Sequence, residues 1–117
     1  MEVARLEAAL ARWPRLAERL FTQDERDFAA RRVRQGEHLA ARFAAKEAAF
    51  KALGTGWPRL SWQEVEVASS IPSGGRPQLR LSGRAAELAG GAQPAISLAH
   101  DGGLAVAQVL LVEGPGC

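Results

Sequence analysis

Four charged side chains interrupt an alanine-rich segment, ARFAAKEAAFKALGTG, at residues 41–56: Arg42, Lys46, Glu47 and Lys51. Three of them are cations and one is an anion. Glu47 and Lys51 are four residues apart, so they share one face of a helix. Mg²⁺ usually takes one or two protein carboxylates and fills its other positions with water and phosphate oxygens. Glu47 could therefore hold such an ion while Lys46 and Lys51 face phosphate groups.

The residues alone leave two interpretations of these charges open. In the first, Glu47 and Lys51 form a surface ion pair worth roughly 0.2–0.5 kcal/mol, and Arg42 and Lys46 are solvated. In the second, the four side chains serve a metal ion and phosphate. The second interpretation gains weight because alanines cover most of this helix beside one stripe of larger apolar side chains, formed by Leu39, Phe43, Phe50 and Leu53.

Helical spacing and start and stop signals predict three helices in the first half of the chain, at residues 2–12, from 22 to about 36, and 37–53. Trp13-Pro14 interrupts the first, because proline restricts the residue before it. Thr22 and Glu25 form a capping-box pattern at the start of the second. Gly54 closes the third. These helices would position the charged segment.

Alternating apolar residues predict strands in the second half, at residues 61–68, 77–83, 95–100 and 104–113. Residues 73–75 (Ser-Gly-Gly) are typical of a turn, and Asp101-Gly102-Gly103 predicts a hairpin between the last two strands. A short helix is expected at 84–88. Helices that precede antiparallel strands indicate the α+β class.

The composition fits one soluble domain over residues 1–117. Hydrophobic residues make up 47% of the chain, and its only cysteine, Cys117, rules out an internal disulfide. The net charge is +2, and 11 of the 15 cations fall in the first 51 residues. Neither a membrane span nor a signal peptide is apparent, so we expect a cytoplasmic protein. No known nucleic-acid-binding motif accompanies the basic half, so nucleic acid is not an expected partner.

Several segments together resemble holo-acyl-carrier-protein synthase, the small bacterial phosphopantetheinyl transferase. RFAAKEAAFKALGTG (42–56) is similar to the signature helix of that family, and LAERLFTQDE (16–25) to the segment before it. The strand segments are matched, in order, by LSWQEVEV (60–67), GRPQLRLSG (75–83) and ISLAHDGGLAVAQVLLVE (96–113). The resemblance covers nearly the whole chain. It implies the phosphopantetheinyl-transferase-like α+β fold, with helices followed by an antiparallel sheet.

The resemblance also implies an activity. The 4'-phosphopantetheine of coenzyme A moves to a serine of apo-acyl carrier protein, in fatty acid biosynthesis, and adenosine 3',5'-bisphosphate leaves. Mg²⁺ is the implied cofactor and Glu47 its ligand, with Lys51 as a second catalytic residue that contacts phosphate. Coenzyme A is expected to bind Arg42, Lys46, Lys51, Arg76, Pro77 and His100. The implied assembly is a homotrimer with active sites between subunits.

One departure from the family concerns the start of the chain. Members of the family normally begin with a strand of the form G-[IV]-G-x-D, and its aspartate is the other Mg²⁺ ligand. The sequence given opens at MEVARL, so that aspartate would lie two residues before Met1. A truncated start and a natively short protein both explain this. We therefore expect an N-terminally truncated domain that binds Mg²⁺ poorly, and the alternative function is an inactive relative that still binds coenzyme A or carrier protein.

Overall fold

The computed structural model describes residues 1–69 and 76–113. Four helices come first: α1 (Val3–Arg12), α2 (Leu16–Leu20), α3 (Gln23–Ala30) and α4 (Gln35–Leu53). A 3₁₀ turn, η1 (Trp62–Glu64), leads into β1 (Val65–Ser69), and β2 (Pro77–Leu81), α5 (Gly83–Ala89), β3 (Gln93–Asp101) and β4 (Leu104–Val112) follow. The predicted α+β class is thus confirmed. The predicted turn at 73–75 lies outside the described residues.

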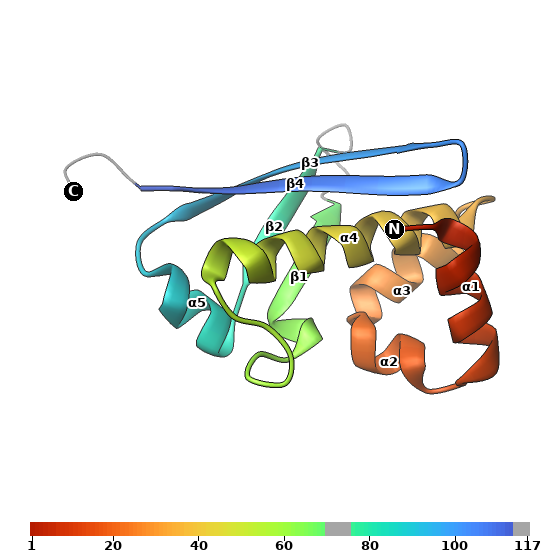
Figure 1. The fold of residues 1–117 in the computed structure, drawn as a ribbon, viewed down its shortest axis with the longest axis horizontal. Coiled ribbons are helices and arrows are strands. Elements are labelled where there is room, and N and C mark those ends of the chain that lie inside the picture. Colours follow the sequence, from red (N-terminus) through yellow and green to blue (C-terminus); the bar gives the residue numbers. More distant parts are fainter. Residues whose placement is uncertain (70–75, 114–117) are drawn as a thin grey trace.

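The longest helix, α4, runs along the β3–β4 hairpin, with α1, α2 and α3 at one end of the molecule and α5 at the other (Figure 1). The strands form two antiparallel pairs, β1–β2 and β3–β4, rather than one continuous sheet. In the second pair Ser97 lies opposite Gln108. The chain begins beside β4, where Met1 and Ala105 exchange two backbone hydrogen bonds of 2.8 Å.

The core has two parts that meet on α4. One part joins α4 to α1, α2, α3 and β4 and includes the buried Leu6, Phe21 and Ala40. The other joins α4 to β1, β2 and α5 around Leu60 and Val65. Small alanines on several sides of α4 allow these neighbours to approach closely, as the sequence predicts. None of the helices within residues 1–69 and 76–113 is both long and apolar enough to cross a membrane.

The second predicted helix is shorter than expected. The capping box at Thr22 and Glu25 is present, but α3 ends at Ala30 instead of near Gly36. Gly36 belongs to the first turn of α4 instead. A Cβ atom at this position would overlap the Glu7 carboxylate of α1. The Glu7 side chain is exposed and could move aside, so the structure shows only that this glycine lies in the first turn of α4 and does not end α3.

Candidate functional site

Glu47 and Lys51 lie on a solvent-facing side of α4. Both side chains are exposed, and their spacing of four residues places them about 40° apart around the helix axis. Lys51 also borders a hollow of about 380 Å³ at the end of α4, together with Phe50, Gly54, Thr55 and Gly56. An exposed carboxylate and an exposed ammonium group thus share one side of α4, and the ammonium group borders the hollow; a carboxylate can hold a metal ion and an ammonium group can contact phosphate.

A second hollow, of about 230 Å³, brings together three of the predicted binding residues from three elements. Arg42 comes from α4, Pro77 from the start of β2 and His100 from β3. Phe28 of α3 and His38 of α4 also line it. The hollow therefore combines an aromatic ring with side chains that can donate hydrogen bonds to an anion.

Cationic groups surround the Phe28 ring beside this hollow. The guanidinium carbons of Arg32 and Arg42 lie 4.0 and 4.1 Å from the ring centroid, within the range of cation–π attraction. The Arg42 side chain is buried, and its guanidinium donates a hydrogen bond of 3.3 Å to the carbonyl oxygen of His38. Burial lowers the pKa of Arg42, Glu25 opposes this effect and Arg32 adds to it. Arginine nevertheless keeps its charge in proteins, so this wall of the hollow is positive.

His100 lies on the same hollow as Arg42. Its Nδ1 atom lies 3.3 Å from Oε2 of Glu37, and its ring centroid lies 6.1 Å from that of His38. Arg76 is exposed and directly precedes Pro77. The structure therefore gathers Arg42, Pro77 and His100 in one place, with Arg76 next to it in the chain.

The environment of His38 leads to a prediction about pH. Burial is the main cause that lowers the pKa of His38, with smaller contributions from Arg42, His100 and Arg32, while Glu37 opposes them. The folded state thus resists a proton that the unfolded chain takes up near pH 6.5. We expect the free energy of unfolding to fall as pH drops from about 7.5 to 5.5.

The measurement is urea denaturation at several pH values for the parent and for His38→Gln, which cannot titrate. The difference between the two proteins isolates His38 from the other groups. We expect His38→Gln to lose less stability than the parent on acidification. Parallel pH profiles for the two proteins would contradict the prediction.

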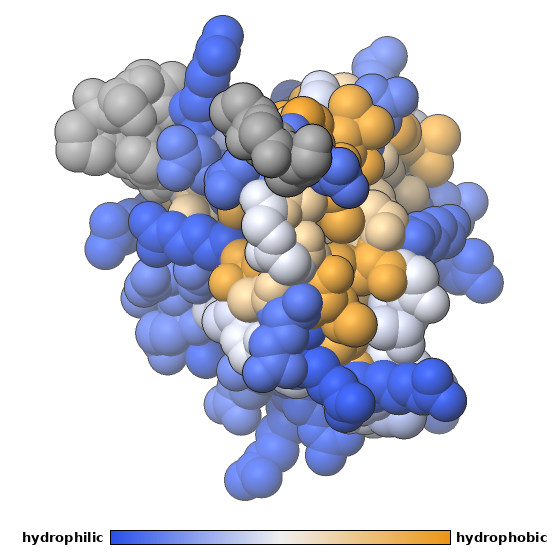
Figure 2. Space-filling model, turned by 90° about the vertical axis from the view of Figure 1, so that its left-hand side faces the viewer, coloured by the Kyte–Doolittle hydropathy of each residue, from blue (hydrophilic) through white to orange (hydrophobic). Residues whose placement is uncertain are grey.

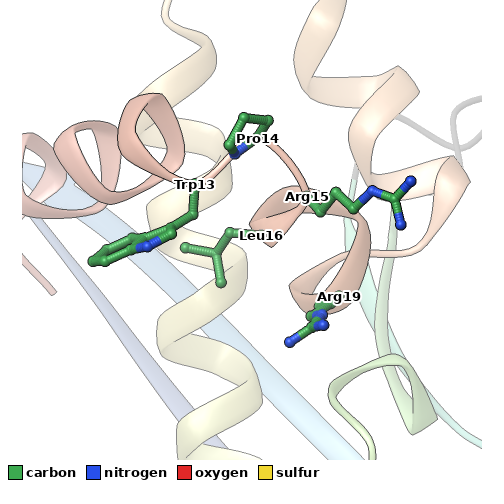
Figure 3. A pocket seen from close by; sticks show the side chains of 5 residues that line it. All are labelled: Trp13, Pro14, Arg15, Leu16 and Arg19. Atoms are coloured by element: carbon green, nitrogen blue, oxygen red, sulfur yellow. The ribbon is translucent and has the colours of Figure 1, made fainter.

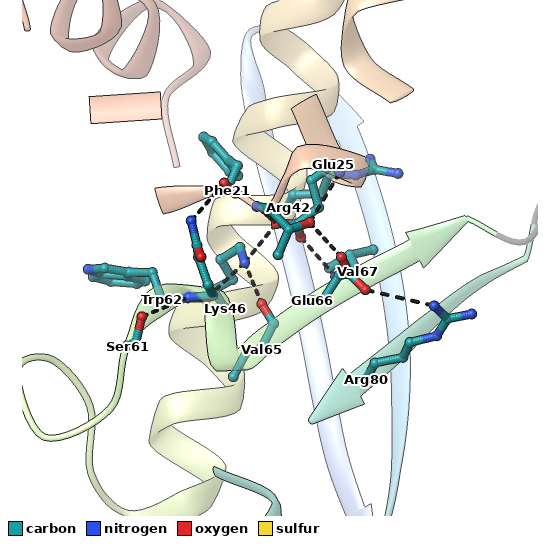
Figure 4. A network of polar contacts seen from close by, with 12 residues as sticks. Phe21, Glu25, Arg42, Lys46, Ser61, Trp62, Val65, Glu66, Val67 and Arg80 are labelled. Carbon is teal, nitrogen blue, oxygen red and sulfur yellow. Dashed lines mark hydrogen bonds and ion pairs between the residues drawn. The ribbon is translucent and has the colours of Figure 1, made fainter. Parts of the chain in front are cut away.

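Lys46 does not face a phosphate, and this corrects the expectation from the sequence. Its side chain is fully buried, and Nζ lies 2.8 Å from Oε1 of Glu25 in α3. Nζ also donates to the backbone oxygens of Trp62, at 2.9 Å, and Val65 (Figure 4). Three acceptors thus occupy the ammonium group inside the protein. We therefore leave Lys46 out of the coenzyme A site.

A signal for the burial of Lys46 is present in the sequence. Lys46 lies seven residues after Leu39 and seven before Leu53, so it falls within the apolar stripe of the helical wheel. Its partner Glu25 was recognised only as part of a capping box. Phe28 and His38 were missed because nothing in the local sequence marks them; their place in the hollow comes from the packing of α3 against α4.

The candidate site residues of α4 form two separate groups. Arg42 and Lys51 are nine residues apart, which places them on opposite sides of a helix at 3.6 residues per turn. Glu47 and Lys51 form one group, and the hollow at Arg42 and His100 forms the other. Each group contains side chains that can contact a phosphate group, in a fold of the α+β class.

Comparison with known proteins identifies the family. The model of the 4'-phosphopantetheinyl transferase superfamily matches residues 1–107. Holo-[acyl-carrier-protein] synthase of Moorella thermoacetica is 47% identical over 116 residues, which cover 97% of this chain and 88% of the relative. The same enzyme of Frankia casuarinae is 49% identical over 113 residues, 94% and 89% of the two chains. The chain belongs to the 4'-phosphopantetheinyl transferase superfamily, as its resemblance implied.

Solved structures share the fold over most of their length. The Chronobacterium ammoniagenes synthase in complex with coenzyme A has a TM-score of 0.85 and 32% identity, and the match covers 97% of this chain and 92% of that one. The Helicobacter pylori synthase, also in complex with coenzyme A, has a TM-score of 0.82 and 26% identity, with coverage of 95% and 94%. The expected phosphopantetheinyl-transferase-like fold is confirmed.

Proposed function

We propose that this chain transfers the 4'-phosphopantetheine group of coenzyme A to a serine of apo-acyl carrier protein in the cytoplasm. The serine oxygen forms a bond to the phosphorus next to the pantetheine arm. The bond from that phosphorus to the bridging oxygen breaks, and adenosine 3',5'-bisphosphate leaves with the electron pair. The serine proton passes to solvent. The observation that carries the proposal is the exposed Glu47–Lys51 pair on α4 of a chain in this family.

The residues of this chain supply charge and position rather than a covalent nucleophile, as phosphoryl-type transfer requires. Lys51 is placed to neutralise charge on the pyrophosphate. His100 and Arg42 line a cationic hollow suited to a phosphate of the nucleotide part, with Pro77 and Arg76 at its edge. Two relatives with the same fold were solved in complex with coenzyme A, which supports coenzyme A as the ligand.

Glu47 could hold Mg²⁺ when phosphate is also present, and with this single carboxylate we still expect weak binding in the absence of coenzyme A. Glu47 offers an exposed carboxylate, and Mg²⁺ needs only one or two protein carboxylates beside water and phosphate oxygens. Within residues 1–69 and 76–113 no three His, Cys, Asp or Glu side chains lie close enough together to hold a metal ion. Glu47 would therefore share the ion with coenzyme A. The bound ion supplies charge neutralisation at the pyrophosphate.

Mass spectrometry of apo-acyl carrier protein after incubation with this chain, coenzyme A and Mg²⁺ tests the activity. The proposal expects a mass increase equal to one phosphopantetheine group on the carrier serine. Binding of coenzyme A without this increase would instead favour the inactive relative that retains only binding. Heat-treated chain is the control for transfer without the folded protein.

We also propose that the complete site forms between copies of the chain in a homotrimer. The two groups of site residues lie on opposite sides of α4, so two copies can each contribute one. β4 offers an apolar surface for such contact, since Leu104, Val106, Leu110 and Val112 are 48–65% exposed. Apolar surface is also visible at the end of the molecule that carries α5 (Figure 2). The C-terminal ends of α4 and β4 lie at this same end. Exposed apolar patches of this kind are typical of interaction surfaces.

Mixing two impaired variants tests the shared site. Glu47→Gln removes the carboxylate group, and His100→Ala removes a side chain from the cationic hollow. If each site takes these residues from different copies, random mixing should restore about a quarter of the sites. We therefore expect the mixture, after subunit exchange, to transfer faster at low coenzyme A than the two variants assayed apart.

The control is a mixture of Glu47→Gln with Lys51→Ala. These two residues lie on the same side of α4, so mixed assemblies should not regain complete sites from this pair. A mixture of Glu47→Gln and His100→Ala that is no faster than the sum of its parts would place the whole site within one copy. Sedimentation of the parent measures the trimer directly.

We also propose that the carrier protein docks on a basic surface formed by α1, α2 and the turn between them. It consists of the exposed Arg5, Arg12, Arg15 and Arg19. Between them a hollow of about 430 Å³ is lined by Trp13, Pro14 and Leu16, with Arg15 and Arg19 also on its wall (Figure 3). The Arg12 guanidinium carbon lies 5.1 Å from the Trp13 ring centroid. Positive charge around an apolar hollow suits an acidic protein surface.

Reversing charge on this surface should slow carrier-protein association at low salt. We expect Arg12→Glu/Arg15→Glu to lower the association rate by on the order of tenfold or more at low ionic strength, because steering acts mainly on the on-rate. The difference should shrink at high salt, where exposed charges are screened. Arg59→Glu/Arg84→Glu makes the same change in net charge elsewhere and is the matched control. Equal rates for both double variants at every salt concentration would contradict docking at α1 and α2.

A further inference from the structure

A buried ion pair lies where α3, α4 and β1 meet. Lys46 Nζ of α4 is 2.8 Å from Glu25 Oε1 of α3, and neither side chain is exposed to solvent. The same ammonium group donates to the backbone oxygens of Trp62 in η1 and Val65 in β1. The Lys46 side chain of α4 thus makes polar contacts with α3, η1 and β1 (Figure 4).

The carboxylate of Glu25 is itself held from two sides. Its Oε2 accepts a hydrogen bond of 2.8 Å from the backbone nitrogen of Val67 in β1. Its Oε1 accepts one of 2.9 Å from the backbone nitrogen of Thr22, which is part of the capping box of α3. Glu25 therefore offers Lys46 a counterion whose position is fixed by β1 and by the start of α3.

Large apolar side chains bury one stripe of α4, where the Phe43 and Phe50 rings pack against Trp62, but the alanines on its other sides add little to the choice of rotation. Alanines are buried on several sides of this helix, against α1, β4 and the β1–β2 hairpin: Ala40, Ala41, Ala45 and Ala49. Side chains this small can exchange places with little change in packing, because they all have the same size and shape. A polar contact with directional partners distinguishes one rotation from its neighbours, as single buried polar residues do in coiled coils.

A contribution to the stability of the folded state does not explain why a charged pair, rather than two apolar side chains, is buried here. Replacing a buried ion pair with apolar side chains of similar volume is often neutral or stabilising. A role in selecting one arrangement of α4 explains why charges are placed there. Glu47 follows Lys46 directly, and Lys51 lies five residues after it, so both directions are set once that of Lys46 is fixed.

We infer that Lys46 and Glu25 are positioning residues that fix the rotation of α4 about its axis and thereby keep Glu47 and Lys51 facing the substrate. The part of this inference that concerns substrate rests on the proposed function. The part that concerns rotation does not, and it can be measured without coenzyme A or carrier protein.

Thiol reactivity along α4 measures the rotation. In a Cys117→Ser background, single cysteines are introduced as Glu47→Cys, at an exposed position, and as Ala45→Cys, at a fully buried one. In the parent the first thiol should react far faster than the second. The test variant is Glu25→Gln/Lys46→Met, which removes both charges while the glutamine oxygen can still accept a backbone hydrogen bond.

We expect the ratio of the two rates to fall by at least about tenfold in the double variant, because a helix without a fixed rotation exposes both positions part of the time. Lys46→Arg, which retains the charge, should keep the ratio closer to that of the parent. We also expect the double variant to bind coenzyme A more weakly while it still melts cooperatively.

A double variant that melts cooperatively and keeps the parent ratio would overturn the inference. If the double variant does not melt cooperatively, Glu25→Gln alone decides: a reduced ratio supports the positioning role and an unchanged ratio overturns it. Failure of the parent to transfer phosphopantetheine would refute the proposed function and leave the thiol rates unaffected, so the two failures are distinguishable.

Discussion

Replacing Glu47 with glutamine should lower the rate of phosphopantetheine transfer by on the order of 10²–10³-fold, since a metal ion at a phosphoryl centre contributes several kcal/mol and 1.36 kcal/mol is a factor of ten. Glutamine keeps the shape of the side chain and removes the charge that Mg²⁺ requires. The position is exposed on α4, so the melting temperature should stay near that of the parent. The measurement is the initial transfer rate over a range of Mg²⁺ concentrations.

Glu87→Gln is the matched control, because it makes the same change at an exposed position on α5. It should transfer at the parent rate. Removal of divalent ions with a chelator should reduce the parent rate and have little further effect on Glu47→Gln. Turnover of Glu47→Gln near the parent rate at saturating Mg²⁺ would remove Glu47 from the site.

Replacing Lys46 with alanine should lower the free energy of unfolding by about 3–5 kcal/mol, because it leaves the buried Glu25 carboxylate without its counterion. The backbone oxygens of Trp62 and Val65 also lose a donor. Urea denaturation gives the free energy. Lys51→Ala is the control on the same helix; its side chain is exposed, and its effect should stay within about 0.5 kcal/mol.

A loss below about 1 kcal/mol for Lys46→Ala would show that water or another group satisfies Glu25, since an uncompensated buried charge costs far more. The same pair of variants separates two roles on one helix. Lys46→Ala should act on stability, whereas Lys51→Ala should act on coenzyme A affinity. A titration of coenzyme A followed by calorimetry distinguishes them.

The sequence by itself determined the order and the type of most elements, but it did not predict α2 or the 3₁₀ turn η1. The capping box at Thr22 and Glu25, the hairpin at Asp101-Gly102-Gly103 and the glycine that ends α4 are local features, and each appears where predicted. The signature helix also indicated the family, which the comparisons confirm. Predictions from such local patterns are correct because hydrogen bonds between near neighbours in the chain fix these caps and turns.

The end of α3 and the division of the strands into two pairs differ from what the sequence predicted. The sequence predicted a helix that reaches Gly36, but α3 ends at Ala30 and Gly36 lies in the first turn of α4. The β1–β2 and β3–β4 hairpins were predicted as parts of one sheet, and the structure keeps them separate.

The partners of the charged side chains were decided only by tertiary structure. Helical spacing placed Glu47 next to Lys51, but it could not reveal that Glu25, 21 residues before Lys46, neutralises that lysine. Nor could it reveal that Arg42 and His100 line the same hollow. The spacing of residues fixes directions within one helix, whereas a counterion from another element is known only when the elements pack. For this reason the sequence identified which residues carry charge, and the fold decided which of those charges face solvent.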